Sequence, residues 1–181
     1  AGYLGGWFEA VVSRLLDALF AFPVLLLAIA VVAVMGPGVE SATVAIGIAQ
    51  IPQFARVARA SMVSEKEHQY VEATRSVGAP SWYIIFRAIL PNTLSSLLVL
   101  ISLGFAYAVL SEAALAFLGM AAQPPTPTWG NMLAVSRRHL FDSAWFSIFP
   151  GVAIFLLVFS LNLVGDGLRD ITDPRRIRRG D

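Results

Sequence analysis

The sequence predicts an all-α fold, namely a polytopic bundle of transmembrane helices in a single domain. Hydrophobic residues make up 57% of the 181 residues and charged residues only 14%, whereas a soluble domain carries about a quarter charged residues. The apolar residues gather in long uncharged runs, and charged stretches separate these runs. We expect about four spans, at residues 18–35, 41–62, 94–118 and 144–165.

The first expected span, residues 18–35, contains no charged residue. As a helix it would be about 27 Å long, close to the ~30 Å hydrocarbon core of a bilayer. Pro23 falls in its first turns, where we expect at most a mild kink. Gly36, Pro37 and Gly38 form a strong turn signal, so the span should end there.

The second expected span, residues 41–62, contains polar residues and a proline: Gln50, Pro52 and Gln53. An interrupted helix is tolerated at membrane depth where it faces protein or a watery path, so these three are candidates for a translocation path. Alternatively, Pro52 only kinks the helix and the glutamines bond to neighbouring helices. Arg56 and Arg59 should mark the end of the span by reaching the headgroups.

Residues 65–92 form a charged segment between apolar runs, which we expect to lie outside the membrane. Its first part, residues 65–77, fits a short amphipathic helix, because apolar or small residues recur on one face. These residues are Tyr70, Ala73 and Val77. Gly78 is well placed to end the helix, since glycine adopts the left-handed conformation without strain. Glu72 and Arg75 should then point outward.

A second short helix is expected at residues 81–90. Pro80 suits its first turn, where a missing N–H has no partner in any case. The segment is apolar nearly all round, which favours burial against other helices. Pro91 should end it, and Asn92 or Thr93 could cap the following span.

The last two expected spans are joined by a proline-rich stretch, residues 124–130, which should be stiff and extended. Trp129 and Trp145 suit the aromatic belt at a membrane boundary. The final span, residues 144–165, has no charged residue and is interrupted by Pro150.

The distribution of positive charge predicts the orientation. If the Gly36 turn and the proline-rich stretch face one side, only Arg137 and Arg138 of the 13 lysines and arginines lie there. The other eleven lie with residues 65–92 and the two ends of the chain. By the positive-inside rule that second side is cytoplasmic, including the C-terminus.

Several kinds of chemistry have no support in the sequence. Cysteine is absent, and no G-x-x-x-x-G-K-[ST] motif occurs, so the chain should not bind ATP through a P-loop. His68 and His139 fall on opposite sides of the membrane without ligand partners in sequence. We therefore expect no catalytic site, metal, cofactor or nucleic-acid partner.

Residues 70–92 carry a specific spacing. Glu72 and Ala73 are followed by Gly78, and Leu90 and Pro91 stand twelve and thirteen positions beyond that glycine. This arrangement resembles the EAA loop of the membrane subunits of ABC importers, which reads E-A-A, three residues, G, nine residues and I-x-L-P. It departs from that pattern at two positions, Thr74 and Ala88.

Further motifs resemble the branch of these importers that carries dipeptides, oligopeptides or nickel. They are the stretch around Glu112, the P-P-x-P-x-W-G loop ending in Trp129–Gly130, and the GDGLRD sequence that begins at Gly165. The glycine-rich opening of the chain resembles a stretch that follows the second span of the family. The resemblance therefore implies four spans of an expected six.

The resemblance also implies a function and partners. The chain would be a permease subunit of the bacterial inner membrane, working with a second permease subunit, two ABC ATPases and an extracytoplasmic substrate-binding protein. ATP hydrolysis would belong to the ATPases, so the chain itself is not expected to be an enzyme. The residues implied in ATPase coupling are Glu72, Ala73, Gly78, Arg87, Leu90 and Pro91. The candidates at the outer face are Glu112 and Trp129. Glu112 could contact substrate or the binding protein, although an ordinary interfacial role for it stays open.

Two rival classes also stay open. A secondary transporter would need ionisable coupling residues at mid-membrane, and a membrane scaffold would use the Glu72 loop only for docking. Either class would work without ATPase coupling.

Overall fold

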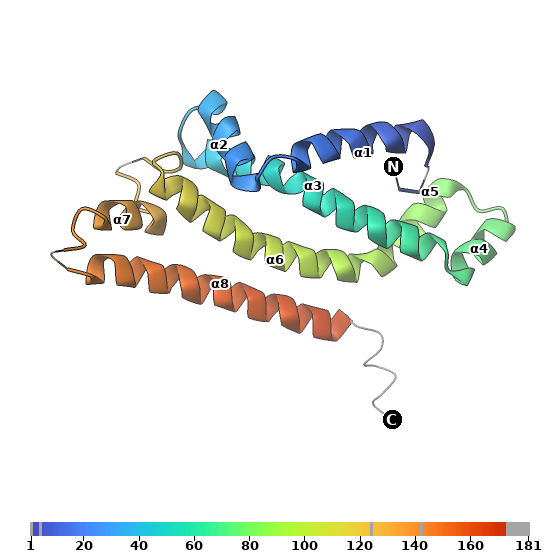
Figure 1. The fold of residues 1–181 in the computed structure, drawn as a ribbon. Helices are drawn as coiled ribbons and strands as arrows, with labels where there is room; N and C mark the ends of the chain where they lie inside the picture. The colour runs from blue at the N-terminus through green and yellow to red at the C-terminus, as the bar shows by residue number, and fades with distance from the viewer. Residues whose placement is uncertain (1, 4, 124, 142, 173–181) are drawn as a thin grey trace.

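The computed structural model describes residues 2–3, 5–123, 125–141 and 143–172, and all regular structure in these residues is helical. The prediction of an all-α fold is confirmed. In chain order the helices are α1 (Gly6–Phe20), α2 (Val24–Met35), α3 (Val39–Lys66), α4 (Gln69–Ser76), α5 (Ser81–Tyr83), the π-helical segment η1 (Ile84–Ile89), α6 (Leu90–Phe117), α7 (Trp129–Ser136) and α8 (Trp145–Thr172) (Figure 1).

Three helices of 28 residues, α3, α6 and α8, lie side by side and form the body of the molecule (Figure 1). Each is about 42 Å long at 1.5 Å per residue. α2 packs on the beginning of α3, and α7 packs on α6 and α8 at the same end of the bundle. α4, α5 and η1 form a small group at the opposite end.

Small residues allow the long helices to approach closely. A Cβ added to Gly165 of α8 would lie 2.9 Å from Cβ of Ser102 on α6. A Cβ added to Gly130 of α7 would lie 2.6 Å from Cβ of Ala116 and 2.7 Å from the carbonyl oxygen of Ala113. Close packing of small residues is a typical basis of helix association in lipid.

The chain bends sharply where only a mild kink was expected. α1 and α2 meet at 90°, and the break lies at residues 21–23, just before Val24. Pro23 has no N–H to donate, and its ring disfavours a helical conformation for Phe22. Pro23 instead takes φ −54° and ψ 131° and accepts the first hydrogen bond of α2 through its carbonyl oxygen. The expectation of a nearly straight helix over residues 18–35 is therefore wrong.

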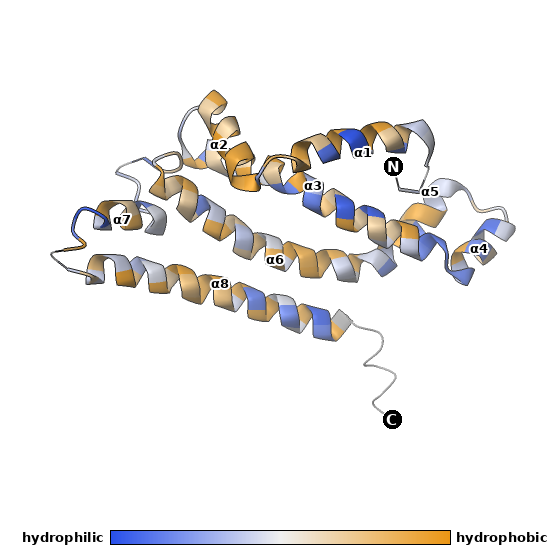
Figure 2. Ribbon diagram, viewed as in Figure 1, coloured by the Kyte–Doolittle hydropathy of each residue, from blue (hydrophilic) through white to orange (hydrophobic). Residues whose placement is uncertain are grey.

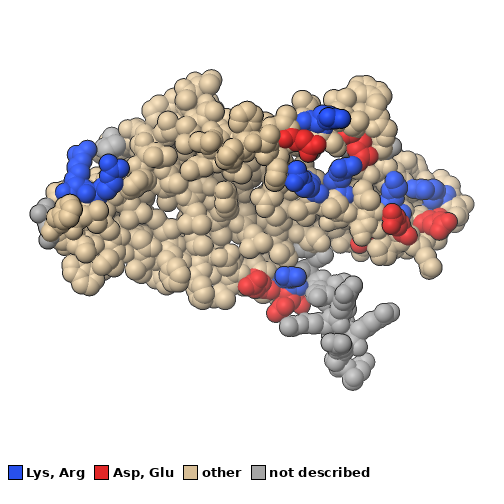
Figure 3. Space-filling view, viewed as in Figure 1, with Lys and Arg blue, Asp and Glu red and all other residues tan. Residues whose placement is uncertain are grey.

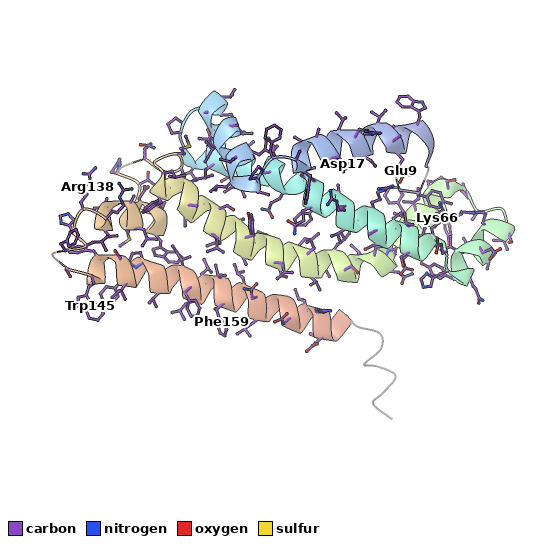
Figure 4. The ribbon with its side chains drawn as sticks, viewed as in Figure 1. Glu9, Asp17, Lys66, Arg138, Trp145 and Phe159 are labelled. Carbon is purple, nitrogen blue, oxygen red and sulfur yellow. The ribbon has the colours of Figure 1, made fainter. Side chains whose placement is uncertain are left out.

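Ionic contacts hold α1 against α3. Arg59 donates to Glu9 at 2.7 Å, and Arg56 lies 3.6 Å from Asp17. The Arg56 guanidinium also lies 3.9 Å from the centre of the Phe20 ring. Figure 4 shows both acidic side chains on the side of α1 that faces α3. The two arginines were expected to reach lipid headgroups; in the structure they contact α1.

Two described helical segments are long and apolar enough to cross a membrane, Ser96–Phe117 and Trp145–Ile171, and the bent pair of α1 and α2 would make a third. The first two correspond to the spans expected at 94–118 and 144–165. α3 does not reach the same apolarity, so the span at 41–62 stays a prediction. Figure 2 shows the mixed composition of α3.

The charged side chains are distributed unevenly along the bundle. In the face shown in Figure 3, lysine and arginine side chains cluster at the left end of the molecule, charged side chains of both signs spread over its right half, and an uncharged belt lies between the two groups. This pattern fits a bilayer around the uncharged belt. The arginine cluster at residues 175–179, used above to predict the orientation, lies outside the described residues.

Candidate functional site

The helix α4 stands at one end of the bundle and carries the first half of the EAA-like spacing. It was expected to begin near Glu65, but α3 continues to Lys66 and α4 begins at Gln69. Gly78 ends it as predicted, with φ +80°. The Gly78 N–H donates to Arg75 O at 3.0 Å and the Ala79 N–H to Thr74 O at 3.3 Å, which is the Schellman pattern of a helix end.

Val71 anchors α4 from a face that the sequence pattern did not identify. Its side chain is fully buried with Ile84 and Ile89 of η1. Ala73 and Val77, which were expected on the buried face, are exposed; 83% of the Val77 surface is accessible. Tyr70 is also exposed, at 36%, so the predicted buried stripe is wrong for all three of its residues.

As a consequence, α4 presents an outward face made of Glu72, Ala73, Ser76 and Val77, all of which are exposed. We call these four residues the α4 outer face. Within the described residues, no hydrogen bond or ion pair is found for the Glu72 carboxylate.

The second short helix does not end at Pro91 but continues into α6. The transition is the π-helical segment η1, in which the Leu90 N–H reaches the carbonyl of Ile85, five residues back. This wider turn relieves the two problems that a proline creates inside a helix, the missing donor and the clash of its ring with the preceding turn. Pro91 consequently sits in the first turn of α6.

The segment 81–90 is also less buried than expected. Ile84 and Ile89 are buried, but Trp82 and Phe86 are each more than half exposed. Of the remaining residues implied in ATPase coupling, Arg87 and Pro91 are exposed and Leu90 is half-buried. The structure therefore leaves a mixed aromatic and basic surface next to α4.

Tyr70 makes contacts that the sequence did not reveal. Its hydroxyl donates to Glu65 Oε2 of α3 at 2.6 Å and accepts from Asn92 Nδ2 of α6 at 3.1 Å. Asn92 Nδ2 also donates to Ala88 O at 3.0 Å, a geometry made available by the continuous helix through Pro91. Sequence reasoning assigned Tyr70 to an apolar face, because a tyrosine in a helical pattern gives no sign of the partners of its hydroxyl.

The surroundings of Tyr70 predict a specific titration. Burial, followed by the hydrogen bond to Glu65, raises the pKa of Tyr70, against a smaller lowering by Asn92. The folded loop therefore favours the neutral phenol. This stabilisation is complete below pH about 10 and is lost as the pH rises through the folded pKa of Tyr70. Ultraviolet absorbance of tyrosinate should show a late-ionising component that Tyr70→Phe removes and Glu65→Leu shifts to lower pH. If the component that Tyr70→Phe removes from the titration curve ionises in the usual pH range of tyrosine, this assignment is contradicted.

A groove between α3 and α6 contains one of the three translocation-path candidates. Gln50 lines it, whereas Pro52 is buried within α3 and Gln53 is exposed outside it. The groove has a volume of about 290 Å³ and otherwise mostly apolar walls. The remaining lining residues are Gly47, Ile51, Phe54, Ile101, Gly104, Phe105 and Ala108.

Gly104 shapes this groove. A Cβ added there would lie 2.9 Å from Cζ of Phe54 and 3.2 Å from Oε1 of Gln50. The missing side chain thus allows Phe54 and the Gln50 amide to lie directly against α6. Sequence reasoning recognised Gln50 as a polar residue in an apolar run, but it could not identify Phe54 or Phe105, which look like ordinary lipid-facing residues.

The two outer-face candidates lie at the other end of the bundle. Glu112 is half-buried near the end of α6, and Trp129 begins α7 and is 42% exposed. Thr128 caps α7 by accepting from the Asn131 N–H at 3.2 Å. Asn131 Nδ2 also donates to the carbonyl of Ala122 at 2.7 Å, which fixes the loop before Trp129. Among the described residues, no group of three His, Cys, Asp or Glu side chains could hold a metal ion.

The sequence and the fold of the chain are similar to those of known proteins. Residues 1–178 match the family described as "Binding-protein-dependent transport system inner membrane component". The chain is 47% identical over 175 residues to the glutathione transport system permease protein GsiD of Pectobacterium atrosepticum, and 45% identical to the dipeptide transport system permease protein DppC of Alkalihalophilus pseudofirmus. Each alignment covers 97% of this chain but 58% of the relative, so the chain spans less than two thirds of these proteins.

The fold is similar to a chain in an inward-facing structure of the MetNI methionine ABC transporter. The TM-score is 0.74 at 18% identity, and the match covers 92% of this chain and 76% of that one.

Proposed function

Because the chain belongs to the family of binding-protein-dependent transport system inner membrane components, we propose that it acts as the membrane-spanning permease subunit of an ATP-driven importer. The observation that carries this proposal is the α4 outer face. It exposes Glu72 and Ala73 on a helix that buried Val71 and the Gly78 turn hold in place. An exposed helix with a fixed direction is suited to docking into a groove of another protein.

In this proposal the α4 outer face and the neighbouring surface of η1 meet an ATPase subunit. Glu72, Ala73 and Gly78 would make the contact from α4 and its turn, and Arg87 would add a basic group from η1. Leu90 and Pro91 would pass the movement on, since η1 and α6 form one continuous helical path. ATP would be hydrolysed by the partner and not by this chain.

The groove between α3 and α6 is our candidate for part of the translocation path. Its walls are apolar apart from the Gln50 amide, which offers both a donor and acceptors. Peptide groups present the same complementary pair, so the groove suits a peptide-like substrate. Relatives named for glutathione and dipeptide transport support this substrate class, and nickel is the other candidate.

The remaining partners and the orientation belong to the same proposal. A second permease subunit would complete the path, two ATPases would bind the cytoplasmic face, and an extracytoplasmic binding protein would deliver substrate near Glu112 and Trp129. The chain would cross the inner membrane several times, with α4 and the C-terminus in the cytoplasm. The positive-inside count supports this orientation.

Reconstitution of the assembled transporter in liposomes tests the proposal. We expect its binding protein, loaded with dipeptide, glutathione or nickel in parallel reactions, to stimulate ATP hydrolysis and uptake for at least one substrate. A control without binding protein should show only basal hydrolysis. Uptake that follows an ion gradient without ATP would instead identify a secondary transporter, and stable assembly without any uptake would favour a scaffold.

A further inference from the structure

The Tyr70 hydroxyl joins three helices at the end of the bundle that carries the α4 outer face. It is placed on α4, donates to Glu65 in the last turn of α3 and accepts from Asn92 in the first turn of α6. The bond to the carboxylate is short, at 2.6 Å, as expected for a charge-assisted hydrogen bond.

The backbone changes direction at His68, between α3 and α4. The N–H groups of Glu67 and His68 donate to Ser64 O and Glu65 O of α3, and His68 takes φ −76° and ψ 145°, so rotation at His68 sets the direction of α4. The hydrogen bond from Tyr70 to Glu65 restricts this rotation, because it spans the link from one helix to the other. The bond from Asn92 restricts the position of α6 in the same way.

The buried contacts of α4 act mainly on the α6 side. Val71 packs with Ile84 and Ile89 of η1, and the partly buried Met62 of α3 lies against the same cluster, so a displacement of α4 passes to η1 and α6 and more weakly to α3. Without the bond from Tyr70 to Glu65, α3 would follow α6 less closely. α3 and α6 form the two walls of the groove at Gln50 and Gly104. If α3 moved less than α6, the walls would shift relative to each other and the groove would not open as a unit.

We propose that Tyr70 is a positioning residue, which ties α4 to the ends of α3 and α6 so that displacement of α4 moves both walls of the groove together. This inference rests on the proposed function, in which an ATPase displaces α4. It adds a residue outside the coupling residues named above, and it assigns the role to the hydroxyl and not to the aromatic ring.

The test compares variants of the assembled transporter in liposomes. Tyr70→Phe keeps the ring and removes both hydrogen bonds; Tyr83→Phe removes a hydroxyl from a neighbouring exposed tyrosine and serves as the matched control. We expect Tyr70→Phe to retain ATPase association and basal hydrolysis but to lower substrate uptake per ATP by about tenfold, the scale of one charge-assisted hydrogen bond. Glu65→Gln, which keeps an acceptor but makes the bond a neutral one of about half the strength, should lower uptake per ATP by only about threefold.

A second readout does not depend on transport. Because the chain has no cysteine, spin labels on cysteines introduced at Lys66 and Leu94 report the distance between the ends of α3 and α6. We expect a narrow distribution in the wild type and a broad one in Tyr70→Phe and Asn92→Leu, with no further broadening in the double variant. Tyr83→Phe should leave the distribution narrow.

The outcomes separate the two proposals. Failure of the wild type to associate with its ATPase would remove the proposed function, while the spin-label distances would still decide whether Tyr70 ties the helices. An unchanged distribution and unchanged uptake per ATP in Tyr70→Phe would overturn the inference. Loss of ATPase association in Tyr70→Phe, as expected for the destabilising control Val71→Ala, would show a structural role and would also overturn it.

Discussion

Glu72→Lys is expected to weaken association with the ATPase by about 100-fold and to abolish substrate-stimulated hydrolysis, while the subunit still inserts into the membrane. Glu72 is exposed on the α4 outer face, so the substitution should change the free energy of unfolding by less than about 0.5 kcal/mol. At a docking surface, in contrast, reversing a charge places like charges together, which costs several kcal/mol. Pull-down of the ATPase with the assembled membrane subunits, followed by a hydrolysis assay, measures both effects.

Glu67→Lys is the matched control for this experiment. Glu67 is an exposed carboxylate in the link before α4 and does not belong to the α4 outer face. The same charge reversal there should leave association close to that of the wild type. Equal effects of the two substitutions would mean that net charge, and not the α4 outer face, governs association.

Gly130→Ala is expected to destabilise the fold more than any other single methyl addition discussed here. The new Cβ would lie 2.7 Å from the Ala113 carbonyl oxygen and 2.9 Å from its Cα. These are backbone atoms of α6 that cannot rotate away, so α7 would have to shift. Overpacking of this kind typically costs about 1–3 kcal/mol, and we expect a clearly lower melting temperature of the subunit in detergent.

Gly151→Ala provides the comparison, because Gly151 also lies within a helix but a Cβ there meets no described atom within 4 Å. Replacing a helical glycine by alanine in open space gains roughly 0.5–1 kcal/mol. The two variants should therefore shift the melting temperature in opposite directions. A similar melting temperature for both would show that the α6–α7 contact is looser than the structure indicates.

The sequence correctly predicted backbone conformation where a single residue type determines it. Gly78 is such a case, since only the left-handed conformation completes the end of α4 there. The long apolar runs likewise predicted α6 and α8, because twenty or so apolar residues in a row have few stable alternatives to a spanning helix.

Prolines were harder to interpret, because their effect depends on the neighbouring helices. Pro23 and Pro91 carry the same local constraint, yet one separates two helices by 90° and the other lies in a continuous helical path. The turn before Pro91 can widen into η1 because Ile84 and Ile89 are held by Val71, a contact between segments that sequence periodicity does not reveal.

The candidate site was predicted as a segment but not as an arrangement of side chains. The resemblance to the EAA loop identified Glu72, Ala73 and Gly78, and polarity identified Gln50. The partners of Tyr70 and the aromatic wall at Phe54 depend on which helices meet, and this information lies in tertiary packing. Periodicity also failed to predict that Val71 is the buried residue of α4. Val71 is buried by Ile84 and Ile89 of η1, and the sequence pattern within α4 does not show on which side of α4 these residues lie.

The π-helical turn has a geometric consequence for the whole end of the bundle. A π turn is equivalent to one residue inserted into an α-helix, and one residue corresponds to a rotation of about 100° around the helix axis. Deleting a single residue between Ile85 and Ala88 would return the segment to α-helical register and rotate everything before it by about that angle relative to α6. The direction in which Glu72 faces is thus set by the number of backbone residues in η1, the segment on which α4 packs, and a change of register there would redirect the α4 outer face without altering any of its side chains.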